Sequence, residues 1–181
     1  MKGRILRRLR VAALVLVAAF CLSVTSCRTR GSVRAGAVLS AMLASEEDIP
    51  AGEIYSSDAE EGERGYLSDS LCVALYGDGE MPPEWAFVSD FAIYLAASEH
   101  PFELSVFRCD SSDGAEEVSE LCSRRLRVLR NHFRGSDYEV YTSGGRVVIL
   151  GSYVLMLVSS DAEGALSEAR EAIRGRSPRA D

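Results

Sequence analysis

The stretch that decides the fold is 87-FVSDFAIYLAASEHPFELSVFR-108, near the middle of the chain. Residues 87–97 and 102–108 are both rich in apolar and aromatic side chains. In the second run, the even-numbered residues would point to one side and the odd-numbered residues to the other. A period of two is the pattern of a β-strand, because successive side chains point to opposite faces of a sheet. The link 98–101 is short enough for a hairpin. We therefore predict two neighbouring antiparallel strands, 87–97 and 102–108.

A second hairpin and two helices are predicted downstream. Residues 147–150 and 153–158 flank Gly151-Ser152, a two-residue link that is typical of a tight hairpin. The run 154–158 is almost continuously apolar, which is the pattern of a central strand covered on both faces. Apolar residues at three- and four-residue spacing predict one helix between the hairpins, over 113–133, and another after the second, over 160–173.

Upstream of the first hairpin, the same spacing predicts two short helices, over 35–43 and 67–75. The segment 51–65 between them is rich in glycine, serine and acidic residues, so we predict a surface loop. The core order is then strand–strand–helix–strand–strand–helix. Consecutive hairpins with interleaved helices predict an α+β fold, a two-layer sandwich in which two helices cover one face of an antiparallel sheet of about four strands.

The N-terminus has the pattern of a lipoprotein export signal. Five basic residues among the first ten precede the apolar run 11–22, which is shorter than the roughly 20 residues of a transmembrane helix. Val24-Thr25-Ser26-Cys27 resembles the lipobox of bacterial lipoproteins, in which small residues precede an obligatory cysteine that accepts diacylglycerol. Cys21 fits poorly, because the bulky Phe20 precedes it. A permanent N-terminal membrane anchor is the alternative reading of this segment.

These patterns divide the chain into four parts. We predict a signal peptide over 1–26, a tether over 27–34, a single domain over 35–174 and a flexible tail over 175–181. Cys27 carries at least two acyl chains by its resemblance to a lipobox, and two chains make membrane attachment stable where one does not. The predicted location is therefore the outer, extracytoplasmic face of the cell membrane, with the lipid of Cys27 as the membrane contact.

Charge and composition exclude several functions. Removal of residues 1–26 leaves 15 basic and 27 acidic side chains, a net charge of −12. Nucleic-acid binding is not expected, because neutralising phosphates needs clustered basic residues. Lys2 is the only lysine of the chain. The mature protein therefore lacks the lysine that a Schiff base, a pyridoxal-phosphate site or a Ser–Lys dyad requires.

No catalytic, metal or cofactor site is predicted. The histidines, His100 in a hairpin loop and His132 near a helix end, have no sequence context that would activate a nucleophile. No closely paired cysteines suggest zinc, and no acidic cluster has the alternating spacing of a calcium loop. Cys109 and Cys122 are a possible disulfide in an exported protein, but we favour two buried thiols.

Asp90 is the most unusual single residue, because it lies inside an apolar strand on the face shared with Val88 and Ala92. A buried carboxylate needs a cationic or hydrogen-bonding partner. The adjacent pair Arg124 and Arg125 on the predicted central helix is the natural candidate. Three interpretations stay open: a solvent-side strand residue, a buried ion pair with these arginines, or a ligand contact at these three residues.

The chain also resembles a known family. The matching features are Tyr76-Gly77 after a short helix, 90-DFAIY-94 opening the sheet, 124-RRL-126 in the central helix and 151-GSYV-154 before the last strand. They resemble the domain of unknown function numbered 4358, which occurs in lipoproteins of Gram-positive bacteria, over roughly residues 35–174. Ser152 departs from the usual pattern, in which asparagine is common, and arginines stand where lysines are usual. The resemblance implies a surface lipoprotein and provides no catalytic residues.

Two classes of function remain at this point. The favoured one is a non-catalytic envelope lipoprotein, a binding or accessory module that contacts another envelope component. The rival is a small extracytoplasmic hydrolase that uses carboxylates such as Asp90 and Glu103, because a catalytic pair is spatial rather than sequential. A solute receptor is less favoured, since such receptors usually need two lobes to enclose a ligand.

Overall fold

The computed structural model describes residues 32–77, 79, 81–83, 85–97 and 99–175. The predicted signal peptide, Cys27 and the tail beyond residue 175 lie outside this part. From Val33 onward, the described residues belong to one compact unit. None of the described helices is both long enough and apolar enough to cross a membrane.

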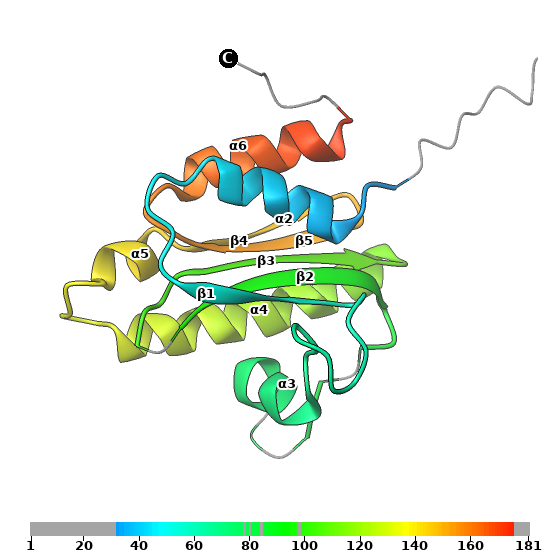
Figure 1. Ribbon diagram of the computed structural model, residues 1–181, viewed down its shortest axis with the longest axis horizontal. Helices are drawn as coiled ribbons and strands as arrows, with labels where there is room; N and C mark the ends of the chain where they lie inside the picture. Colours follow the sequence, from blue (N-terminus) through cyan, green and yellow to red (C-terminus); the bar gives the residue numbers. More distant parts are fainter. Residues whose placement is uncertain (1–31, 78, 80, 84, 98, 176–181) are drawn as a thin grey trace, which may run out of the picture. The chain divides into compact units, whose positions relative to one another are not determined.

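The secondary structure comprises, in chain order, α2 (Ala35–Ala44), β1 (Gly52–Ser56), α3 (Asp69–Tyr76), β2 (Val88–Ala96), β3 (Glu103–Cys109), α4 (Ser112–His132), α5 (Glu139–Ser143), β4 (Arg146–Leu150), β5 (Tyr153–Val158) and α6 (Ala162–Ile173). The α+β class and the antiparallel sheet are thus as predicted. All strands of the described part form one sheet, in the order β1-β2-β3-β5-β4 (Figure 1).

Both predicted hairpins are confirmed. Strands β2 and β3 pair antiparallel, with Phe91 opposite Phe107. Strands β4 and β5 pair likewise, and Leu150 lies opposite Tyr153 across the two-residue link. Gly151 in that link has φ +63°, a left-handed conformation that glycine adopts without strain.

The predicted count of four strands is wrong, because β1 adds a fifth. This strand lies at the start of the segment that we expected to be a loop, and it pairs with β2 alone. It is five residues long, begins with Gly52, and leaves the side chain of Ile54 half exposed. A short edge strand buries little apolar surface, so its sequence carries only a weak period-two signal.

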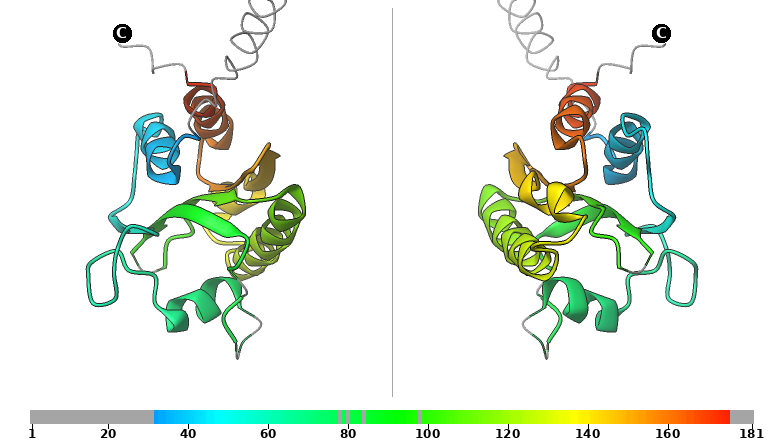
Figure 2. Two further views of the ribbon diagram at one scale, coloured as in Figure 1. Left: turned by 90° about the vertical axis from the view of Figure 1, so that its right-hand side faces the viewer. Right: turned by 90° about the vertical axis from the view of Figure 1, so that its left-hand side faces the viewer.

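The helices cover both faces of the sheet, so the predicted two-layer sandwich is also wrong. Helices α2 and α6 pack together on one face, and α4 packs on the other, with α3 beside it (Figures 1 and 2). The reason lies in β3 and β5, whose apolar side chains point to both sides. All six residues of β5 are buried, as the apolar run 154–158 predicted for a doubly covered strand.

Two hydrophobic cores therefore flank one sheet. The first contains Leu104, Leu155 and Leu157 beneath α2 and α6. The second contains Phe107 and Met156 beneath α4. Because neighbouring residues of a strand belong to different cores, each polar residue within β2 or β3 can be assigned to one helical layer from its position alone.

Candidate functional site

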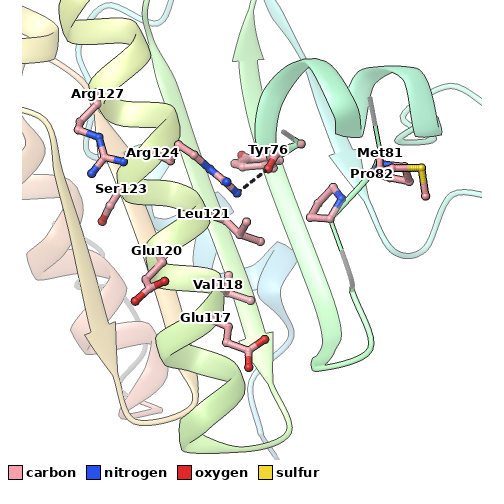
Figure 3. A pocket seen from close by; sticks show the side chains of 12 residues that line it. Tyr76, Met81, Pro82, Glu117, Val118, Glu120, Leu121, Ser123, Arg124 and Arg127 are labelled. Atoms are coloured by element: carbon pink, nitrogen blue, oxygen red, sulfur yellow. Dashed lines mark hydrogen bonds between the residues drawn. The ribbon is translucent and has the colours of Figure 1, made fainter. Parts of the chain in front are cut away.

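A pocket of about 570 Å³ lies between α4 and the segment that follows α3 (Figure 3). Its wall on α4 carries Glu117, Val118, Leu121 and Arg124, and the opposite wall includes Tyr76 and Pro82. Volumes of about 300–1,000 Å³ are typical of small-ligand pockets. Its lining is mixed, with the charged side chains of Glu117, Glu120, Arg124 and Arg127 around the apolar Val118 and Leu121.

The periodicity of α4 sets the order of these side chains. Glu117, Leu121 and Arg124 have the spacing i, i+4, i+7, so they lie along one face of the helix. Figure 3 shows these three side chains on the side of α4 that faces Tyr76 and Pro82. The acid and the arginine are thus two helical turns apart, with the leucine between them.

Tyr76 connects the pocket wall to the interior. Its backbone oxygen accepts a hydrogen bond from Nη2 of Arg124 at 3.3 Å. Its ring is buried and makes edge-on contacts with Trp85 and Phe107, at centroid distances of 5.7 and 5.5 Å. Position 77, directly after Tyr76, requires glycine, because a Cβ there would lie 2.7 Å from backbone atoms of Val73 and Met81.

Beneath the pocket, Tyr76 joins a buried charge network. Its hydroxyl donates to Oε1 of Glu103 at 2.8 Å, and the Ser105 hydroxyl donates to the same oxygen at 3.3 Å. Nε of Arg125 donates to Oε2 of Glu103 at 3.1 Å. The carboxylate is 1% exposed, so the arginine balances its charge within the second core. This network holds Tyr76 in place and so supports one wall of the pocket.

The buried charge network also affects the pKa of the Cys122 thiol. Burial raises the pKa of Cys122 well above its ordinary value, and the negative charge of Glu103 adds to the rise. Burial likewise raises the pKa of Cys109 to about 11. Both thiols therefore stay protonated near neutral pH, and a protonated thiol is a poor nucleophile. In the described part, Cys72, Cys109 and Cys122 are all free and buried.

Asp90 lies on the other face of the sheet, in the layer of α2. Its Oδ2 accepts a hydrogen bond from the backbone N–H of Ala35 at 2.8 Å, and its Oδ1 accepts one from the Ser57 hydroxyl at 2.9 Å. Nε of Arg34 lies 3.5 Å from the same carboxylate. Asp90 is 3% exposed and occupies the N-terminus of α2, where a negative charge is favourable.

The predicted pairing of Asp90 with Arg124 or Arg125 is therefore wrong. Both arginines belong to α4, which covers the opposite face, and they bind Tyr76 and Glu103 instead. Asp90 and Glu103 also face opposite sides of the sheet. The carboxylate pair of the rival hydrolase hypothesis is thus not assembled.

His100 and His132 both lie near aromatic rings. Nδ1 of His100 accepts a hydrogen bond from the backbone N–H of Phe102 at 3.1 Å, and the imidazole packs against Tyr138 and Tyr141. Burial lowers the pKa of His100. The ring of His132 contacts Phe133 at a centroid distance of 4.8 Å. Neither histidine is among the described residues that line the pocket.

Among the residues that the structure describes, no group of three or more histidine, cysteine, aspartate or glutamate side chains is arranged to hold a metal ion.

The contacts of Tyr76, Glu103 and Arg125 with one another were not predicted from the sequence. The pairing of Glu103 with Arg125 and the role of Tyr76 depend on contacts between β3, α3 and α4. A signal was present, since Glu103 and Ser105 are polar neighbours on one face of an apolar strand. That alternation indicates a buried polar partner but not which helix supplies it.

No protein-family model, curated protein or solved structure matches this chain.

A third buried carboxyl group, after Glu103 and Asp90, lies between the end of α2 and the start of α6. Glu46 is 9% exposed, and within the described residues its Oε1 has no hydrogen-bond partner. Burial raises the pKa of Glu46, the Asp161 carboxylate adds to the rise, and the nearby Ser159 hydroxyl opposes it. Ser159 Oγ also lacks a partner with hydrogen-bonding geometry in this part of the structure. The ionised form of Glu46 is therefore disfavoured by folding.

We expect Glu46→Gln to stabilise the protein at pH 7.5, by about 1 kcal/mol or 2–4 °C in Tm. A pKa that is raised in the folded state means that stability falls as pH rises above the ordinary value for glutamate, 4.5. The gain should shrink as the pH is lowered towards 4, where the wild-type carboxyl is protonated. Thermal unfolding across this range measures it, with the exposed Glu47→Gln as control. A gain that does not depend on pH would contradict the prediction.

Proposed function

We propose that this protein is a lipid-anchored extracytoplasmic lipoprotein that acts as a non-catalytic binding or accessory module of the cell envelope. The observation that carries the proposal is Val24-Thr25-Ser26-Cys27 directly after a basic and then apolar leader. We also propose that the chain belongs with the lipoprotein domain of unknown function numbered 4358, on the motifs quoted above.

The way in which the domain begins supports this anchorage. The hydroxyl of Tyr153 donates to the backbone oxygen of Val33 at 2.6 Å, and Asp90 accepts from the N–H of Ala35. The chain is thus attached to the sheet at Val33, six residues after Cys27. Six residues span at most about 20 Å when fully extended. In a lipidated protein, this end of the domain would therefore stay close to the membrane surface.

A binding role is supported by the chemistry of the pocket. Its described lining residues include arginines, glutamates and one serine, but neither cysteine nor histidine. A nucleophilic serine needs an adjacent base. Within the described part, no hydrogen bond joins Ser123 to such a base. Charged groups around an apolar middle instead favour the recognition of a ligand.

The proposal is tested by capture from intact cells. Cells that express the tagged wild type are treated with a membrane-impermeant crosslinker, the membranes are solubilised, and the protein is purified. We expect an envelope component that is captured by the wild type and by Arg134→Glu, but not by Arg124→Glu. Arg134 is a matched control, since it is an exposed arginine near the end of the same helix and does not line the pocket.

A catalytic activity would contradict the proposal. Turnover of cell-wall fragments by the purified protein, with no stable partner captured, would show that the protein is an enzyme. The proposed non-catalytic role would then be wrong.

A further inference from the structure

The charges of the pocket are arranged in a way that defines a ligand. The α4 wall carries two acids towards one end, Glu117 and Glu120, and two arginines towards the other, Arg124 and Arg127 (Figure 3). Glu117 and Arg124 lie on the side that faces Tyr76 and Pro82, and their separation of seven residues corresponds to about 10.5 Å along the helix axis. A ligand that contacts both charges therefore needs a cationic group and an anionic group about that far apart.

Both charged groups are available for such a ligand. Within the described residues, the carboxylate of Glu117 takes part in no ion pair or hydrogen bond. Arg124 uses one N–H of Nη2 for the backbone oxygen of Tyr76, which orients the guanidinium and leaves its other N–H groups for a ligand. A guanidinium held in this way is preorganised to bind a carboxylate.

The middle of the pocket is apolar. Val118 is buried and Leu121 is half-buried, while Pro82 lies on the opposite wall. Apolar side chains bind the middle of a ligand through burial, whereas polar groups at the ends set its orientation. A sugar chain, which carries hydroxyl groups along its whole length, does not match this pattern.

We infer that the pocket binds a short peptide of about three or four residues, with its amino terminus at Glu117 and its carboxylate at Arg124. An extended chain rises about 3.3–3.6 Å per residue, so three or four residues separate their terminal charges by about the required distance. The inference rests on the proposed function, in that it assigns a ligand class to the same pocket. The geometry also excludes long peptides in this mode, because their termini would be too far apart.

The inference is tested with trialanine and two blocked forms of it. Full-length protein in detergent is titrated calorimetrically with trialanine, N-acetyl-trialanine and trialanine amide. We expect trialanine to bind in the micromolar to millimolar range, and each blocked form to bind at least ~10-fold more weakly, because it lacks one of the two charges.

Two variants assign the ends of the peptide. Arg124→Gln should reduce the difference in affinity between trialanine and its amide, because the main partner of the carboxylate has been removed while Arg127 remains. Glu117→Gln should likewise reduce the difference between trialanine and its N-acetyl form. Arg134→Gln, outside the pocket, should preserve the wild-type differences. Equal binding of all three peptides by the wild type, or no binding of any, would overturn the inference.

The result is separable from the proposed function. Failure to bind trialanine while the Arg124-dependent capture of an envelope component persists would leave the binding module intact and remove only the peptide. Mass spectrometry of the titrated samples adds a third outcome. Binding followed by cleavage would support the peptide site but contradict the non-catalytic role.

Discussion

Cys27→Ala is expected to abolish stable membrane attachment of the mature protein. The thiol of Cys27 is the group that would accept the diacylglycerol, and alanine offers no acceptor. Two acyl chains make membrane attachment effectively stable. Without them, the mature chain has a net charge of −12 and lacks the lipid that would hold it at the membrane. We expect the variant either in the soluble fraction or as a precursor that retains the predicted signal peptide. Fractionation and intact mass distinguish these two forms.

The matched control is Cys21→Ala, which removes the other cysteine of the leader. Because bulky Phe20 precedes Cys21, this change should leave processing and lipidation at wild-type levels. A Cys27→Ala protein that is still cleaved at the same bond and stays membrane-bound would rule out the lipid anchor. Membrane-bound wild-type protein that retains residues 1–26 would instead favour a permanent membrane-inserted N-terminus.

Arg125→Ala is expected to have the largest effect on folding stability, a loss of about 3 kcal/mol. The change removes the cation that lies 3.1 Å from Glu103 and leaves a carboxylate that is 1% exposed without a charged partner. Tyr76 and Ser105 still donate hydrogen bonds to the other carboxylate oxygen, which limits the loss. Chemical denaturation of the wild type and the variant measures the difference in the free energy of unfolding.

Arg127→Ala is the control, because Arg127 is an exposed arginine of the same helix and makes no ion pair within the described part. It should change the stability by less than about 0.5 kcal/mol. The double variant Glu103→Gln/Arg125→Ala should lose less stability than the two single variants lose together, since the unpaired charge is no longer present. Strict additivity would show that Arg125 acts through its packing and not through Glu103.

The sequence predicted the parts of this protein that are encoded locally. Both hairpins follow from period-two runs on either side of short links, and the buried strand β5 follows from an unbroken apolar run. The lipobox interpretation also depends on four adjacent residues, and it stays a prediction because these residues lie outside the described part. Such signals are contained within a few neighbouring side chains, so no tertiary information is needed to detect them.

The layering of the helices was decided by tertiary packing. Alternation along β2 and β3 shows which residues share a face, but it does not show which helix packs on that face. The sequence therefore placed two helices on one face, whereas α4 and α6 lie on opposite faces. Strand β1 was missed for a related reason, because an edge strand is defined by its pairing with β2 more than by its own residues.

The partners of the buried carboxylates were decided in the same way. The sequence left open whether Asp90 is buried; it is buried, and its charge lies at the N-terminus of α2 and not beside an arginine of α4. Arg125 instead pairs with Glu103, and Arg124 lines the pocket. A buried charge must have a partner, and this requirement can be read from one strand. The identity of the partner depends on which elements the fold brings to each face of the sheet, and these come from distant parts of the chain.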